Sequence, residues 1–162
     1  MLRKATLLAA VVAVLMVVTA GVAWAVTEYG GPGDNHIVGT DGEDDLFGLA
    51  GDDTIRGLAE DDYENGGPNS DRLWGGIGDD SLWGGLGPDT LFGGNGEDIL
   101  WGNDGNDVLR GGDNNDELHA RDGIPDNDFV IGGGGTDDTC IADSPLEIDF
   151  TTCENIDVPA QP

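Results

Sequence analysis

Apolar side chains recur with a period of nine residues along most of the chain. Consecutive nonamers from Gly75 read GGIGDDSLW, GGLGPDTLF, GGNGEDILW, GNDGNDVLR and GGDNNDELH, and the same phase runs back to Gly30. A stretched unit of residues 120–131 and a last unit of residues 132–140 follow. The eighth position is aliphatic in ten of these twelve units, and only Glu64 and Thr139 interrupt it.

One apolar position in nine cannot form the apolar face of a helix, which requires a spacing near 3.6 residues. We therefore divide each unit into a six-residue turn and a three-residue strand whose middle side chain points inward. Two such units make a coil of 18 residues, and successive coils stack about 4.8 Å apart. The pattern predicts an all-β parallel solenoid in which each turn lies above the turn 18 residues earlier.

The sixth position forms a second column, and this column is acidic. It contains Asn35, Asp44, Asp53, Asp62, Asp71, Asp80, Asp89, Asp98, Asp107, Asp116, Asp128 and Asp137. Stacked carboxylates about 5 Å apart repel by roughly 1 kcal/mol in water and by more at a protein surface. A cation between successive turns reverses the sign of this interaction. Carboxylate and backbone carbonyl oxygens in a flexible turn suit Ca²⁺ better than Mg²⁺ or zinc.

The overall charge agrees with a cation as partner. The chain of 162 residues has 6 basic and 33 acidic residues, a net charge of −27. Nucleic acid and anionic membranes would be repelled by such a surface. Acidic, glycine-rich composition is also typical of disordered chains, but a nine-residue phase held over residues 30–140 favours an ordered, metal-bound state.

GGLGPDTLF and GGIGDDSLW resemble the nonapeptide of RTX (hemolysin-type) calcium-binding repeats in every defined position. The resemblance implies a right-handed parallel β-roll that folds on Ca²⁺, with aspartates and turn carbonyls as ligands. The implied carboxylate ligands are Asp44, Asp53, Asp71, Asp80, Asp89, Asp98, Asp107, Asp116 and Asp137. The implied carbonyl ligands include those of Gly76, Gly78, Gly85, Gly87, Gly94 and Gly96. Glu60 and Glu64 depart from the pattern, so the site of Asp62 is left open, as are those of Asn35 and of residues 120–131.

The ends of the chain differ from the repeats. Residues 1–25 have a basic start, an apolar run and Ala23-Trp24-Ala25, which predicts a signal peptide cleaved before Val26; an uncleaved membrane anchor is the alternative. Cleavage leaves 4 basic and 33 acidic residues, a net charge of −29. Residues 26–29 form a short N-terminal segment, residues 30–140 the roll, and residues 141–162 a cap or, alternatively, a disordered tail.

The two cysteines lie at this C-terminal end. In an exported chain Cys140 and Cys153 predict one disulfide, with two free thiols as the alternative. The segment that holds them resembles the cysteine-containing segments that close some secreted actinobacterial repeat proteins. A cap of this kind covers the open end of the last coil.

We find no sequence motif of a hydrolase, metalloprotease or nucleotide-binding loop, and we expect no enzyme. Position nine carries outward aromatic residues, with Trp74 and Phe92 on one sheet and Trp83 and Trp101 on the other. They predict either a stacking ladder that stabilises the sheet or a strip that docks a glycan or protein. The sequence therefore predicts a secreted calcium-binding repeat protein; the alternative is a calcium-gated adhesion or docking module with an unknown cell-surface partner.

Overall fold

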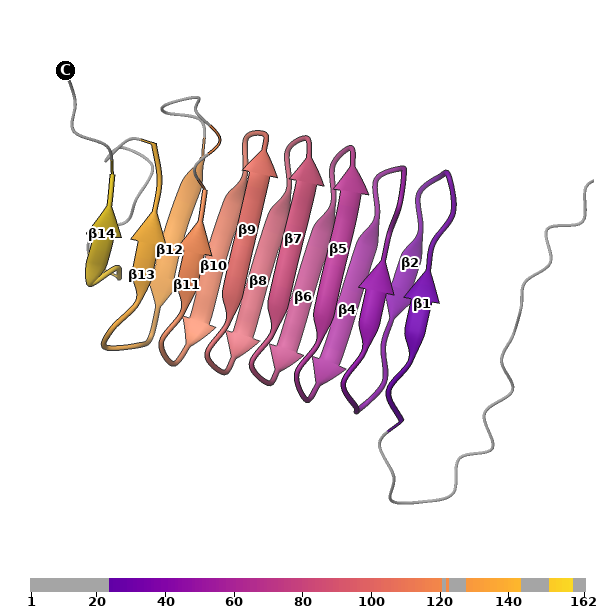
Figure 1. Cartoon of the computed structure of the whole chain (residues 1–162), viewed down its shortest axis with the longest axis horizontal. Coiled ribbons are helices and arrows are strands. Elements are labelled where there is room, and N and C mark those ends of the chain that lie inside the picture. Colours follow the sequence, from indigo (N-terminus) through magenta and orange to yellow (C-terminus); the bar gives the residue numbers. More distant parts are fainter. Residues whose placement is uncertain (1–23, 121, 123–127, 144–151, 159–162) are drawn as a thin grey trace, which may run out of the picture.

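The chain folds into two parallel β-sheets that face each other across one narrow interior (Figure 1). The computed structural model describes residues 24–120, 122, 128–143 and 152–158. Successive strands alternate between the two sheets, so the chain winds as a flattened solenoid, and the strands of the two layers run in opposite directions in Figure 1. The expected all-β parallel roll is confirmed. The proposed signal peptide of residues 1–25 lies almost entirely outside the described residues and stays a prediction.

Eight strands form one sheet within the described part of the chain and six form the other. The larger sheet has the order β1 (Thr27–Tyr29), β3 (Asp45–Phe47), β5 (Tyr63–Pro68), β7 (Ser81–Leu86), β9 (Ile99–Asp104), β11 (Glu117–His119), β13 (Thr139–Ile141) and β14 (Asn155–Asp157). The smaller sheet has the order β2 (His36–Val38), β4 (Thr54–Ala59), β6 (Arg72–Ile77), β8 (Thr90–Asn95), β10 (Val108–Asp113) and β12 (Phe129–Gly133).

The strands pair in the register that the nine-residue phase predicts. Leu73 lies beside Leu91, and Leu82 beside Leu100, each offset by 18 residues. The central strands are longer than expected, because they continue through the first three positions of the next unit, as in β7 and β8. The sheet also begins before Gly30, because β1 pairs with β3.

The last coil corrects one part of the predicted register. Leu118 pairs with Cys140, not Thr139, and the inward column therefore ends on Cys140. The same shift places Asp138 in the acidic column, whereas Asp137 is exposed. Asp138 follows Asp128 in the acidic column after ten positions, one more than the usual nine. A count in nines from Gly132 therefore predicted Asp137 in place of Asp138.

The interior consists of one inward column from each sheet. Its members are almost completely buried, and they are Ile37, Leu46, Ile55, Leu73, Leu82, Leu91, Leu100, Leu109, Leu118, Val130 and Cys140. Each coil thus contributes only two sizeable apolar side chains to the core. Because 18 residues must be ordered to bury them, apolar burial alone is a weak source of stability for each coil.

Aromatic rings form a ladder on the outer face of each sheet. On the larger sheet the rings of Trp83 and Trp101 are stacked with centroids 5.1 Å apart, and Trp101 stacks on His119 at 3.7 Å. On the smaller sheet Trp74 and Phe92 are stacked at 5.5 Å. The expected pairs are confirmed, and within each stacked pair the facing ring surfaces cover each other.

Arginines close the ladder on the smaller sheet. The guanidinium of Arg56 lies 5.2 Å from the ring centre of Trp74, and that of Arg110 lies 5.6 Å from Phe92. Such cation–π contacts add about 0.5–1 kcal/mol each at exposed sites. The described residues also contain no helix with the length and apolar character that a membrane crossing requires.

Glu64 occupies an inward position where every neighbouring coil has an aliphatic residue. It lies between Leu46 and Leu82 on adjacent strands and is fully buried. Neither carboxylate oxygen has a hydrogen-bond partner of normal geometry. Burial, followed by the charge of Asp80, raises the pKa of Glu64 well above its usual value, and the backbone N–H groups of Gly57 and Trp74 offset this only in part. In the turn of the same unit Leu58 and Glu60 have positive φ angles of 105° and 66°, a conformation that is uncommon for residues other than glycine.

We predict that Glu64→Leu stabilises the roll. The substitution restores the aliphatic column and removes a buried carboxyl group without a partner, so the free energy of unfolding should rise by about 2 kcal/mol. Denaturant unfolding in saturating calcium measures this change. Glu117→Leu is the matched control, because Glu117 is exposed on β11, and it should alter stability by less than about 1 kcal/mol. An unchanged or lower stability of the Glu64→Leu chain would contradict the prediction.

Candidate metal sites

The turns of the roll form two rows, one preceding the strands of each sheet. Each turn ends at an acidic-column residue, and every described aspartate of the column is at most 7% exposed. One row contains Asp44, Asp62, Asp80, Asp98, Asp116 and Asp138, and the other contains Asn35, Asp53, Asp71, Asp89, Asp107 and Asp128. The 18-residue register places each carboxylate directly beside that of the next coil.

One oxygen of each carboxylate takes part in a ladder of hydrogen bonds between coils. The backbone N–H of Asp62 donates to Oδ1 of Asp80 at 2.9 Å, and the N–H of Asp80 donates to Oδ1 of Asp98 at 2.8 Å. The other row repeats the contact, since the N–H of Asp71 donates to Oδ1 of Asp89 at 2.8 Å. These bonds fix the carboxylates in orientation and hold successive turns in register.

The second oxygen of the same carboxylates is buried and has no hydrogen-bond partner. This is the state of Oδ2 in Asp53, Asp62, Asp71, Asp80, Asp89, Asp98, Asp107, Asp116 and Asp138. A buried, unpaired carboxylate is costly unless a cation compensates it. The described arginines do not serve this purpose, because Arg56, Arg72 and Arg110 belong to strands of the smaller sheet.

In the metal-free turns, burial and like charge strongly disfavour the ionised form of these aspartates. Burial raises the pKa of Asp80 and of Asp89 to about 8, and neighbouring carboxylates add to the effect. The pKa is raised to about 7 for Asp62 and Asp116 for the same first cause, although the backbone hydrogen bond opposes it. Without a cation, these groups therefore favour the protonated form at a pH where free aspartate is ionised.

Main-chain carbonyls of the turns supply further oxygens. Gly76 and Gly78 have φ angles of 127° and 144°. A Cβ at either position would overlap the carbonyl oxygen of Leu58 or Glu60, which lies on the coil before. Glycine at these positions therefore allows the carbonyls of one turn to approach the next turn closely.

This set of donors fits calcium. It consists of carboxylate and carbonyl oxygens from two stacked turns, which are hard ligands in a chain that can adapt to a large coordination sphere. No group of three or more His, Cys, Asp or Glu side chains that could hold a metal occurs among the described residues. Side chains alone therefore do not build a site there, and the carbonyls of the turns are needed to complete one.

The structure places most of the predicted ligands as expected. Asp44, Asp53, Asp71, Asp80, Asp89, Asp98, Asp107 and Asp116 lie in the two buried rows. The six glycines predicted from the resemblance, Gly76, Gly78, Gly85, Gly87, Gly94 and Gly96, all have positive φ angles. Their binding of calcium itself stays a prediction.

Three column residues were misplaced or left open by the sequence. Asp62, left open because of Glu60 and Glu64, has the same burial and hydrogen bond as its neighbours. Asp128 accepts the N–H of Asp107 at 2.8 Å, so the stretched unit keeps its place in the row. Asp138 replaces Asp137, and a signal for this was present in Cys140, which is a better inward residue than Thr139.

The disulfide between Cys140 and Cys153 is confirmed, with Cα atoms 5.9 Å apart. Cys140 belongs to β13 and Cys153 precedes β14, and both are buried. The bond therefore attaches the C-terminal segment to the last coil, as expected of a cap.

Comparison with known proteins agrees with this geometry. The family model described as RTX calcium-binding nonapeptide repeat (4 copies) matches residues 29–64, 65–91 and 92–124, more than half of the chain. Neither the curated proteins nor the solved structures gave a match. The buried acidic rows, the glycine turns and the matched repeats lead to one conclusion: the chain belongs to the family of RTX calcium-binding nonapeptide repeats, whose ion is Ca²⁺.

Proposed function

We propose that this chain is an extracellular, non-catalytic protein whose roll folds when calcium binds between its stacked turns. The observation that carries the proposal is the row of buried Oδ2 atoms without partners, including those of Asp80 and Asp98. Each such oxygen makes the metal-free roll less stable at neutral pH. Calcium between two turns would neutralise two carboxylates at once and stabilise the contact between coils.

Sharing of ligands makes the proposed folding cooperative. The carboxylate of Asp80 accepts a hydrogen bond from the N–H of Asp62 in the turn before it. The backbone N–H of Asp80 donates to the carboxylate of Asp98 in the turn after it. An ion bound in one gap therefore orders residues that border the next gap. Repeat arrays with such nearest-neighbour coupling fold cooperatively along their length.

Export to an oxidising compartment is supported by two features. Residues 1–25 have the composition of a signal peptide, and Cys140 and Cys153 form a disulfide, a bond that persists outside the cytosol. Extracellular calcium is abundant enough for weak sites, which extracellular modules commonly have.

The alternative function, a calcium-gated module that docks a glycan or protein through the aromatic strip, stays a prediction. The stacked rings of Trp83 and Trp101, 5.1 Å apart, lie 11° from parallel. Ring faces in mutual contact are not open to a sugar ring, so this geometry favours a ladder that stabilises the sheet.

Calcium titration tests the proposed function. In chelator the chain should lack the β-sheet signal in far-UV circular dichroism, and calcium should restore it cooperatively, with magnesium much less effective. Asp98→Asn should raise the calcium midpoint about fivefold or more, because loss of about 1 kcal/mol changes an equilibrium about fivefold. Asp79→Asn removes the same charge from an exposed turn position and should shift the midpoint far less. An identical spectrum and melting temperature in chelator and in calcium would refute the proposal.

The pKa shifts predict an unusual pH dependence for the metal-free chain. The folded pKa values of Asp80 and Asp89 lie at about 8, above the unfolded value of 3.8. The folded form therefore binds more protons than the unfolded form between these values, and its stability falls as the pH rises. In chelator, lowering the pH from 8 to 5 should increase the β-sheet signal in circular dichroism.

Substitutions distinguish the contribution of these buried carboxylates to the pH dependence from that of the net charge of the chain. Asp80→Asn and Asp89→Asn should flatten the pH dependence in chelator, whereas the exposed Asp79→Asn should leave it nearly unchanged. Equal effects of all three substitutions would attribute the pH dependence to net charge instead. In saturating calcium the dependence should reverse, since protons compete with the ion for the same carboxylates.

A further inference from the structure

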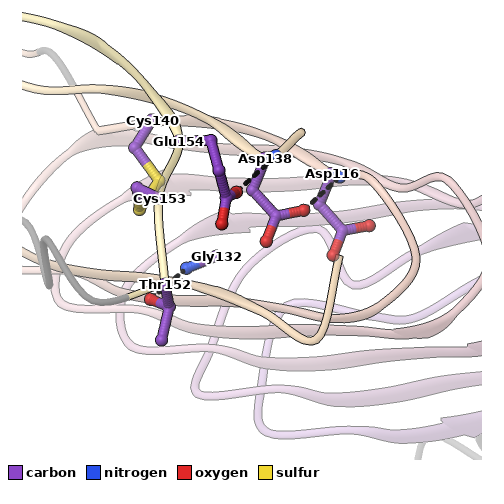
Figure 2. Close-up of a disulfide and its surroundings, with 7 residues drawn as sticks. All are labelled: Asp116, Gly132, Asp138, Cys140, Thr152, Cys153 and Glu154. Carbon is purple, nitrogen blue, oxygen red and sulfur yellow. Dashed lines mark hydrogen bonds between the residues drawn. A yellow bond between two sulfur atoms is a disulfide. The ribbon is translucent and has the colours of Figure 1, made fainter. Parts of the chain in front are cut away.

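The ladder of hydrogen bonds does not stop at the last repeat. The backbone N–H of Asp116 donates to Oδ1 of Asp138 at 2.9 Å, as each coil does to the next. The N–H of Asp138 then donates at 2.9 Å to Oε2 of Glu154, which belongs to the C-terminal segment (Figure 2). Glu154 therefore takes the position that the aspartate of one more coil would occupy.

The backbone of the same segment also continues the roll. β14 pairs in parallel with β13, and Ile156 lies beside Cys140 of the inward column. A Cβ on Gly132 would overlap the carbonyl oxygen of Thr152, just as a Cβ on Gly111 would overlap that of Gly132. The N–H of Gly132 also donates to Oγ1 of Thr152 at 3.1 Å (Figure 2). The cap therefore directs two kinds of oxygen at the last coil, the carbonyl of Thr152 and the carboxylate of Glu154. Only Cys153 lies between these two residues in the sequence.

The last coil carries the same kind of buried, unsatisfied charge as the other coils of its row. Asp138 is fully buried, and its Oδ2 has no hydrogen-bond partner. The carboxylate of Glu154 lies close by, because its Oε2 accepts the N–H of Asp138 at 2.9 Å. A cation beside these two carboxylates would offset both the burial of Asp138 and the repulsion between the like charges.

We propose that Glu154 completes an additional calcium site at the C-terminal end of the roll, where the ion binds between Asp138 and Glu154. The inference rests on the proposed function, since it assumes that the repeat turns bind calcium. In this site the main-chain carbonyls of residues 133–137 would supply further oxygens, as we propose for the equivalent turns of the roll. The cap thereby becomes part of the metal-binding structure and not only a cover for the apolar interior.

The disulfide positions this ligand. Cys153 immediately precedes Glu154, and its bond to Cys140 ties it to the inward column of β13. Glu154 itself is exposed, and besides this tether its own N–H donates to the carbonyl oxygen of Asp138 at 3.1 Å. The state of the disulfide should therefore control the occupancy of this one site.

Native mass spectrometry of the full chain, with its disulfide intact and calcium near saturation, tests the proposal. Glu154→Gln keeps an oxygen that accepts the N–H of Asp138 but removes the charge, so this variant should bind one calcium ion fewer. Glu28→Gln makes the same change on exposed β1 at the opposite end, and it should bind as many ions as the unaltered chain. Hydrogen exchange should show loss of calcium-dependent protection in β13 and β14 for Glu154→Gln alone.

Reduction of the disulfide supplies a second arm. It should remove one ion from the unaltered chain and no further ion from Glu154→Gln, because both changes act on the same site. An equal number of ions in the unaltered chain and Glu154→Gln would overturn the inference, as would the loss of an ion from Glu28→Gln as well. Absence of calcium binding in every chain would instead overturn the proposed function itself.

Discussion

The burial of like charges in register dominates the energetics of this roll. Each aspartate of the column must lie in the turn, because its Oδ1 accepts the N–H of the coil before and fixes the 18-residue register. In Asp53, Asp62, Asp71, Asp80, Asp89, Asp98, Asp107, Asp116 and Asp138 the same placement leaves Oδ2 enclosed and without a hydrogen-bond partner. The hydrogen bonds that build the solenoid and the repulsion that opposes it thus come from one side chain. In the proposed function a bound cation removes this repulsion.

The small apolar core explains why packing does not compensate for the repulsion between the buried carboxylates. Each coil encloses two aliphatic side chains, such as Leu82 and Leu91, and its glycine-rich turns contribute little apolar area. Glycine also loses more conformational entropy on ordering than other residues. A protein with a larger core could tolerate buried charges within its total stability. In the proposed function the stability of each coil therefore depends on the ion, and calcium becomes a condition of folding.

The regular part of the fold could be predicted from the sequence because the nine-residue phase specifies three things at once. It gives the inward column, the buried carboxylates and the glycines with positive φ, and residues such as Leu91, Asp80 and Gly78 confirm each of them. The nine-residue period alone could not predict the register of the last coil. There the spacing changes to ten, and either Thr139 or Cys140 could point inward. Neither could it identify Glu154, because that residue acts through a contact with Asp138 made after the repeats have ended.

The two ends of the array follow from the direction of its hydrogen-bond ladder. Each carboxylate accepts from the coil before it, so the first coil needs a donor from the preceding segment and the last coil needs an acceptor from the following one. At the start, the N–H of Val26 donates to Asp44 at 2.7 Å. The other row begins with Asn35, whose amide carries no charge and whose N–H donates to Asp53 at 2.7 Å. A neutral residue fits there because the described residues contain no earlier turn of this row that could share an ion with it. At the opposite end the last N–H of the row and its last buried carboxylate belong to Asp138. Glu154 accepts this N–H directly, and in the site we propose it would share a cation with the carboxylate.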